Sequence, residues 1–482
     1  MTTQTTMTTR PAMAVLGVLD VDGLHLADTP LAPIRGAIRH VGDLYNGARR
    51  HGLTHLWLTD AWVRTAGLPD TLAVAGQFRE LRHPFVSDGL ADLHAFPTAL
   101  TPWLDLRKKG EAGSSVSIVF PLYDEHAVWG LDTDGATLVA ALLAYAGSVG
   151  VPYYRSPGRT GIDLLQELGK RGAGSQREYP ERLPVPAGQA DTVTELSWLR
   201  TLSPAERGKA YLHSYDKNAL WLSAAGVVEL GLSGIEERHD PTGKLSFDKK
   251  LPGYWLARIA GAEERWACTP TVAWALERGQ VVAITQAHVW TKHSRAMETW
   301  YERLRAARTA LYDDTTPPGR LALGALKYTY SLTISSFNSA WNRDKRSPLY
   351  RPDWRHLVIA QANANMSRAL HKMDAAGYTP VAVHKDAVYL LSDEPDPVKA
   401  CPPSVTLGTG LGHFKVQDAA IPLERVLPAF DGVSGGGLGT LLRLLKPLRA
   451  ATAERTPVGG ASCVRPRAGP AVAPGGRGGR PA

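Results

Sequence analysis

The sequence predicts an α/β protein with two folded parts, each of which mixes strands and helices. Short apolar, β-prone runs alternate with helical periodicity along most of the 482 residues. A polar stretch rich in Pro and Gly, residues 173–195, interrupts the pattern and is expected to be a linker. The composition is that of a globular protein, with 44% hydrophobic and 21% charged residues. This length is sufficient for two to three domains and a large core.

The first predicted domain covers 13–172 and follows a polar leader over 1–12. From Ala14 onward, the run Val-Leu-Gly-Val-Leu-Asp-Val-Asp-Gly-Leu-His-Leu indicates a strand, an Asp-Gly turn and a second strand. Thr160 is expected to cap the last helix of the domain. The other predicted elements are a helix over 33–52, strands over 55–59, 115–123 and 125–131, and helices over 137–147 and 160–171.

The second predicted domain covers 196–430 and again mixes strands with helices. Its expected strands are 210–215, 253–259, 280–289, 379–383, 387–391 and 412–416. Its expected helices are 219–225, 271–278, 294–312, 318–335 and 353–376. A Gly-rich segment and a short basic helix, 438–451, are predicted within 431–454. A Pro/Gly/Ala/Arg-rich tail over 455–482 is expected to lack regular structure.

Positive charge is spread unevenly along the chain. The formal net charge is +8, and after residue 440 eight basic residues accompany a single acid, Glu454. The body of the protein is therefore nearly neutral, with local basic clusters. This distribution fits a protein that binds a polyanion along a groove. The alternative is that the basic tail only keeps the protein in solution.

The cysteines and the apolar runs indicate a cytoplasmic protein without a membrane contact. Cys268, Cys401 and Cys463 are far apart and form no Cys-x-x-Cys pair, which favours reduced thiols over a zinc knuckle or a disulfide framework. The longest uncharged apolar run, 136–151, is short for a membrane span and is expected to be a buried helix. The first ten residues lack the apolar core of a signal peptide.

Two aspartates stand at the ends of strand-like runs. Asp216 follows the run 210–215, and Asp386 lies between the runs 379–383 and 387–391. A helical insert rich in Arg and Lys separates them. Two carboxylates in such positions can bridge divalent cations, which polarise the oxygens that exchange in phosphoryl transfer. The alternative is that each aspartate only caps a turn or helix after its strand.

The order of these features resembles the palm and fingers of family B DNA polymerases, especially the protein-primed kind of phages. Residues 216–223 resemble the motif Asp-x-x-Ser-Leu-Tyr-Pro-Ser, and 327–331 a divergent form of Lys-x-x-x-Asn-Ser-x-Tyr-Gly. Residues 382–387 loosely match Tyr-x-Asp-Thr-Asp-Ser, and 411–415 match Leu-Gly-x-x-Lys. The resemblance covers about 205–420 of the printed sequence. The actinobacterial telomere-associated proteins of linear replicons are a second group that the arrangement resembles.

The resemblance implies a role for particular residues in replicating a plasmid, a phage or a linear chromosome end. Asp216 and Asp386 would be the catalytic carboxylates that hold two Mg²⁺ or Mn²⁺ ions. The residues implied to bind the triphosphate and sugar of a dNTP are Lys327, Arg303, Arg305, Arg308 and Trp221. The residues implied to contact DNA are Lys415, Lys385 and Lys217. The implied partners are primer–template DNA or single-stranded ends, dNTPs, and a terminal or replication protein.

Departures from the family motifs keep a second function open. His384 and Lys385 stand where the third motif has Asp and Thr, and Ala219 replaces the Ser of the first motif. A lysine beside Asp386 competes with a cation for that carboxylate. These changes favour a protein that binds DNA ends or single strands without copying them. A third possibility is an α/β regulatory protein that does not bind nucleic acid.

The resemblance also places the N-terminal domain where the family has a ribonuclease-H-like exonuclease. Such a site needs acidic residues around two metal ions. Asp20 and Asp22 are spaced as in the family's Asp-x-Glu pair, but Gly23 follows directly, so a hairpin turn is favoured over a nuclease site. The glycines of 408–412 do not open a helix with Lys-Ser/Thr, so this stretch is expected to be a flexible turn rather than a phosphate loop.

Overall fold

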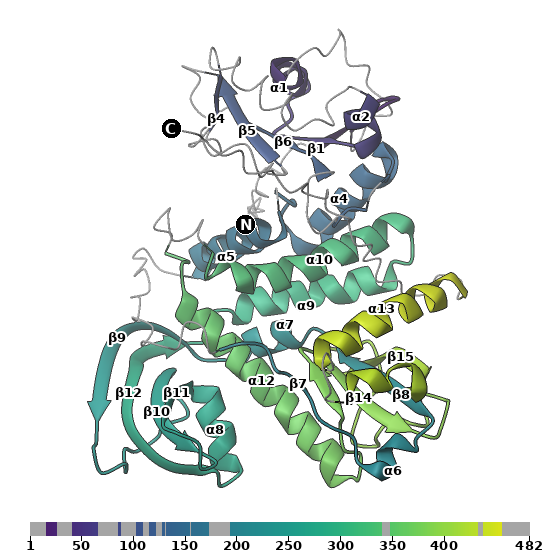
Figure 1. Ribbon diagram of the computed structural model, residues 1–482. Coiled ribbons are helices and arrows are strands. Elements are labelled where there is room, and N and C mark those ends of the chain that lie inside the picture. Colours follow the sequence, from purple (N-terminus) through teal and green to yellow (C-terminus); the bar gives the residue numbers. More distant parts are fainter. Residues whose placement is uncertain are drawn as a thin grey trace, which may run out of the picture. The chain divides into compact units, whose positions relative to one another are not determined.

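The computed structural model confirms a mixed α/β architecture with three sheets (Figure 1). The described residues are 16–26, 41–65, 85–87, 103–108, 115–121, 128–130, 132–154, 156–172, 193–339, 348–431 and 437–455. They divide into two compact units. Unit 1 holds the described residues within 1–196, 217–377 and 403–415. Unit 2 holds those within 197–216, 378–402 and 416–482.

The N-terminal part of unit 1 contains a six-stranded sheet in the order β2-β1-β3-β6-β5-β4. Strands β1, β3 and β6 run parallel, whereas β2, β5 and β4 each pair antiparallel to a neighbour. The predicted hairpin is confirmed, because Asp20 pairs with Gly23 across the turn. The elements are β1 (Leu16–Asp20), β2 (Gly23–Leu26), α1 (Val41–Arg50), β3 (His55–Leu58), α2 (Asp60–Thr65), β4 (Phe85–Ser87), β5 (Trp103–Lys108) and β6 (Val116–Val119).

Two expectations for this region are wrong in detail, and some lie outside the described residues. Residues 128–130, predicted as the end of a strand, form a turn. Thr160 does not cap α5 (Pro157–Gly172), because the helix begins three residues earlier and the Thr160 hydroxyl donates to the Ser156 carbonyl at 2.9 Å. Proline favours the first helical turn, since its φ is preset and its missing N–H is not needed there. The leader, residues 33–40 and 122–127, most of the linker and residues 456–482 are not described.

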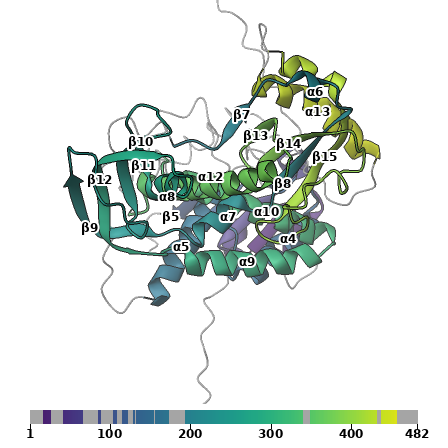
Figure 2. The ribbon, with the colours of Figure 1, turned by 90° about the horizontal axis from the view of Figure 1, so that it is seen from below.

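A layer of helices forms the largest core of unit 1 (Figure 2). Tyr145 of α4 shares a buried hydrogen bond of 2.9 Å with Thr329 of α10. At Gly161 of α5 a Cβ would lie 1.7 Å from the hydroxyl of Thr333, so only glycine permits the close approach of α5 and α10. The apolar run 136–151 is a largely buried helix, as predicted, and no helix among the described residues has the length and apolar composition of a membrane span. The helices are α4 (Gly135–Val149), α5, α9 (Glu298–Asp313) and α10 (Pro317–Ser336).

A second sheet of unit 1 is antiparallel, in the order β11-β10-β12-β9. Strand β10 matches its predicted bounds, whereas β9 and β11 were not predicted. Strand β9 lies at an edge and carries exposed Glu236 and Glu237, so its outer half lacks the apolar alternation that marks a strand in a sequence. The elements are α7 (Leu220–Ala225), β9 (Leu230–His239), β10 (Gly253–Ile259), β11 (Arg265–Cys268), α8 (Thr269–Glu277), β12 (Val281–Ser294) and α12 (Pro352–Ala375).

A fully buried ion pair joins the start of α12 to this sheet. Arg351 donates to both oxygens of Asp353 and, at 2.8 Å, to the carbonyl of Gly231 in β9. Its guanidinium lies 4.5 Å from the ring centre of Trp354 and 5.6 Å from that of Trp290. Burial raises the pKa of Asp353, and the Arg351 guanidinium opposes that shift. Because both side chains are buried, water cannot solvate either charge, and each charge is stabilised by the other.

Unit 2 is built on a five-stranded sheet in the order β15-β8-β14-β13-β7. Leu441 and Leu445 of the C-terminal helix α13 are buried with Ile421, Leu423 and Phe430. A helix predicted over 438–451 therefore forms and extends to Arg455. The elements are β7 (Ser197–Leu199), α6 (Pro204–Arg207), β8 (Tyr211–Lys217), β13 (Ala382–His384), β14 (Ala387–Ser392), β15 (Phe414–Pro422), the 3₁₀ turns Leu423–Arg425 and Leu427–Ala429, and α13 (Leu438–Arg455).

Replacing Arg351 with Met is expected to destabilise the protein by about 3–5 kcal/mol, because it leaves the buried Asp353 charge without a partner. The double change Arg351→Met/Asp353→Leu should be less harmful than Arg351→Met alone. Urea unfolding of the three proteins measures both effects. Equal losses in the single and the double variant would contradict the dependence of one charge on the other.

Candidate functional site

Asp216 and Asp386 lie at the same end of two neighbouring strands in unit 2. Strand β8 pairs antiparallel with β14, and Asp216 is opposite Ala387. Asp386 directly precedes Ala387 and belongs to the two-residue turn between β13 and β14. Asp216 is 8% exposed, whereas Asp386 is half-buried. The pairing therefore brings two aspartates that are far apart in the sequence to the same end of one sheet.

The turn that carries Asp386 is conformationally unusual. His384 pairs with Ala387, so Lys385 and Asp386 alone connect β13 to β14. Lys385 has φ 58°, a left-handed conformation that two-residue hairpins normally fill with Gly or Asn. Lys385 is exposed, and the His384 ring lies 3.3 Å from the Ser197 hydroxyl on β7. Of the two residues that depart from the family motif, Lys385 therefore lies in the turn, and His384 ends strand β13 and contacts the edge strand β7.

A buried polar network holds β8 just before Asp216. The Ser214 hydroxyl donates to Asp418 of β15 at 2.5 Å. Asp418 also accepts two hydrogen bonds of 2.7 Å from Arg449 of α13. Alternate residues of a strand face the same side of a sheet, so Ser214 and Asp216 share a face. The C-terminal helix thereby fixes the strand that carries Asp216, a role for Arg449 that the sequence did not reveal.

Lys217, the residue after Asp216, has its contacts within unit 1. Its ammonium donates to the Asn365 carbonyl of α12 at 3.2 Å and lies 5.5 Å from the ring centre of Phe414. Burial, with a contribution from the positive charge of Lys372, lowers the pKa of Lys217 from 10.5 to about 8. Its amino group therefore loses its proton at a lower pH than that of an exposed lysine.

Two of the predicted phosphate-binding cations meet at one aromatic ring. Arg308 of α9 and Lys327 of α10 lie 4.8 Å and 5.8 Å from the ring centre of Tyr312. Arg308 is 5% exposed and donates to the Thr409 carbonyl at 2.9 Å. Arg303 instead donates to the Val149 carbonyl at the end of α4.

The other predicted site residues are dispersed. Arg305 is exposed on α9, and Lys415 is exposed on β15. Trp221 is half-buried on α7, where it packs against the helical core. Arg305 is thus three residues from the buried Arg308 on α9, but its side chain is exposed.

The glycine stretch 408–412 is a turn that leads into β15, as predicted, but hydrogen bonds hold it in place. The side-chain amide of Asn218 donates to the Gly408 carbonyl at 2.6 Å, and its main chain bonds to both Gly412 and His413. Arg308 holds the same stretch through Thr409. Side chains distant in sequence therefore satisfy two of its backbone carbonyls.

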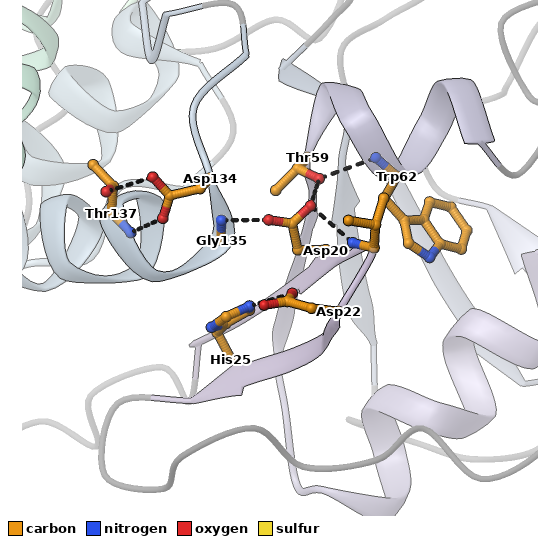
Figure 3. A network of polar contacts seen from close by, with 9 residues as sticks. Asp20, Asp22, His25, Thr59, Trp62, Asp134, Gly135 and Thr137 are labelled. Atoms are coloured by element: carbon orange, nitrogen blue, oxygen red, sulfur yellow. Dashed lines mark hydrogen bonds and ion pairs between the residues drawn. The ribbon is translucent and has the colours of Figure 1, made fainter.

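The N-terminal hairpin carries a second acidic cluster, shown in Figure 3. Asp20, Asp22 and His25 each offer an atom that could hold a metal ion, all within 4.8 Å of one another. Asp20 already accepts hydrogen bonds from the Thr59 hydroxyl at 2.6 Å, the Val21 amide at 2.8 Å and the Gly135 amide at 2.6 Å. The His25 ring lies 2.8 Å from Asp22, whose side chain is 53% exposed.

These hydrogen bonds make Asp20 a structural carboxylate that joins β1 to the start of α4. A Cβ at Gly135 would lie 2.4 Å from the His25 ring, so glycine is required for this approach. Asp134 caps α4 by accepting from the Thr137 amide at 2.8 Å, and the amide and hydroxyl of Thr137 hold the pKa of Asp134 below its usual value. The cluster could hold a divalent cation only by sharing Asp20 with these donors.

Comparisons with known proteins found similar solved structures at low sequence identity. No family model and no curated protein matches it. The chain is similar to phi29 DNA polymerase complexed with primer–template DNA and incoming nucleotides, with 10% identity, 76% of each chain covered and a TM-score of 0.45. It is also similar to phi29 polymerase complexed with single-stranded DNA, with 10% identity, coverage of 76% and 75%, and a TM-score of 0.43. For the family B polymerase of the hyperthermophilic archaeon Pyrobaculum calidifontis, the identity is 12%, the coverage 90% of this chain and 61% of that one, and the TM-score 0.33.

Asp20→Ala is expected to lower the free energy of unfolding by about 2–4 kcal/mol, because it removes a buried acceptor and leaves the Gly135 amide without its partner. The matched change Asp22→Ala removes an exposed carboxylate and should cost less than about 1 kcal/mol. Chemical denaturation of both variants in EDTA measures the difference. Equal effects of the two changes would contradict the structural role of Asp20.

Lys217 should make stability depend on pH. The unfolded chain keeps the Lys217 proton up to about pH 10.5, whereas the folded protein releases it near pH 8. Between these values the unfolded state binds more protons, so the free energy of unfolding rises with pH, by up to about 3 kcal/mol from this group. The rise should be absent in Lys217→Met and present in Lys399→Met, which removes an exposed lysine. Urea unfolding across the pH range, compared between the three proteins, provides the measurement.

Proposed function

We propose that the chain is a DNA-replication protein that transfers nucleotides to a primer terminus, with Asp216 and Asp386 as its metal-binding carboxylates. The observation that supports this most is the β8–β14 pairing. It brings the aspartates of two separate polymerase-like motifs to one end of a sheet. If each aspartate only capped a turn after its own strand, the two strands would have no reason to be neighbours in the sheet.

The two carboxylates suit Mg²⁺ or Mn²⁺. Mg²⁺ prefers oxygen ligands and commonly uses one or two carboxylates together with water and substrate phosphates. Asp216 supplies a carboxylate from a fixed strand, and Asp386 one from a tight turn. When bound, such ions polarise the attacking and leaving oxygens of phosphoryl transfer. With His384 in place of a third carboxylate, we expect weaker cation binding and a need for higher metal concentrations.

Lys327 and Arg305 are the residues that would bind a triphosphate. Lys327 is half-buried beside Tyr312, and Arg305 is exposed on α9. Positive charge placed in advance stabilises the charge that develops on the leaving pyrophosphate. Arg308 would act mainly by holding the 408–412 turn, since its guanidinium is buried and donates to Thr409.

The second candidate is a protein that binds DNA ends or single strands without copying them. The turn at Lys385 and Asp386 favours it, because an exposed ammonium next to a carboxylate opposes cation binding. A terminal or replication protein as a partner fits either candidate.

Primer extension with the full-length chain distinguishes the candidates. With Mg²⁺ or Mn²⁺, the wild-type protein should extend a primer, and Asp216→Asn and Asp386→Asn should each lose activity by about 10²-fold or more. Asp393→Asn is the control, because Asp393 is an exposed aspartate of unit 2 that pairs with Lys209. Absence of extension by the wild type, with binding to single-stranded DNA intact in all four proteins, would refute the enzyme and support the binding protein.

A further inference from the structure

Basic side chains surround a tryptophan where α8 packs against α12 in unit 1. Figure 1 shows the two helices. The ring centre of the half-buried Trp274 lies 5.9 Å from the guanidinium carbon of Arg278 and 5.4 Å from that of Arg368. The His371 ring lies 6.1 Å from the same indole. Planar cations on an indole form a surface on which a further flat ring can stack.

This surface continues along one face of α12. Asn365, Arg368 and Lys372 follow one another at helical spacings of three and four, so they share a face. At Asn365 the carbonyl accepts a hydrogen bond from Lys217, which places this ammonium beside α12. We name this set, Trp274, Arg278, Arg368, Lys372 and Lys217, the Trp274 strip.

Positive charge on the strip exceeds what its carboxylate neutralises. Glu277 pairs with Arg368 through hydrogen bonds of 2.9 and 2.7 Å. Arg278 contacts the His371 ring instead, and among the described residues neither Arg278 nor Lys372 is ion-paired with a carboxylate. A bound phosphate would supply the negative charge that Arg278 and Lys372 lack.

We propose that the Trp274 strip binds single-stranded DNA. Phosphates lie on Arg278, Lys372 and Lys217, and an unpaired base stacks on the platform of Trp274 and its guanidinium groups. Single-stranded nucleic acid combines the two features that the strip matches, a polyanionic backbone and exposed base faces. The proposal names a DNA-binding surface for the function proposed above, but the binding requires no chemistry at Asp216 or Asp386.

Binding of a short fluorescent oligothymidylate to the full-length chain, followed by anisotropy at several salt concentrations, tests the strip. Trp274→Ala should weaken binding about tenfold, whereas Trp274→Phe keeps a ring and should retain most of the affinity. Lys372→Ala should weaken binding and reduce the slope of log affinity against log salt by about 0.7. Lys244→Ala is the matched control, because Lys244 is an exposed lysine of the same unit between β9 and β10.

A wild-type protein that does not bind the oligonucleotide at low salt overturns the proposal. Unchanged affinity in both Trp274→Ala and Lys372→Ala also overturns it, as does an equal loss in Lys244→Ala. Lys372 is exposed, so its removal tests the strip without disturbing the core. The outcome is independent of catalysis. If the strip variants lose DNA binding and the wild type does not extend a primer, the strip is supported and the enzyme is refuted. If the wild type extends a primer and the strip variants bind DNA normally, the enzyme is supported and the strip is refuted.

Discussion

The pairing of β8 with β14 is the interaction on which the proposed site depends. Its strands come from chain segments separated by most of unit 1, so closing this long loop costs conformational entropy before the pairing forms. Burial of Leu212, Ala387 and Tyr389 against the helices of unit 2 offsets that cost. The Ser214–Asp418–Arg449 network adds directional contacts. The packing of α13 thus supports the strand that carries Asp216.

Buried charges in this protein are mostly structural. Asp20 accepts hydrogen bonds from three donors, Asp418 pairs with Arg449, and Arg351 with Asp353. Each buried carboxylate of this kind would be costly without those partners. An acidic residue next to a strand is therefore not by itself a sign of a metal site. What distinguishes Asp216 and Asp386 is that two strands from distant segments present them at one end of a sheet.

The basic residues also divide into those that hold the fold together and those that the fold leaves exposed. Arg303 and Arg308 lie on one helix, yet each donates to a backbone carbonyl, of Val149 and Thr409 respectively. Their guanidinium groups complete the hydrogen bonding of a helix end and a turn. By contrast, Arg278 at Trp274 and Lys372 on α12 are exposed, and among the described residues neither is ion-paired with a carboxylate. In the proposed strip, the positive charges of Arg278 and Lys372 are the ones available to bind the phosphates of a nucleic acid.

Local patterns in the sequence determined the mixed α/β class, the Asp-Gly hairpin, strand β10, and helices α10 and α12 to within a residue or two, because periodicity and turn chemistry act over a few neighbouring residues. They also placed Asp216 and Asp386 at strand ends. Only the tertiary structure decided that β8 pairs with β14. It also decided that Asp20 accepts hydrogen bonds from Thr59 and Gly135, and that the guanidinium of Arg368 lies over the ring of Trp274. Strand partners and side-chain contacts between distant segments depend on burial across the whole chain, which no local window of sequence contains.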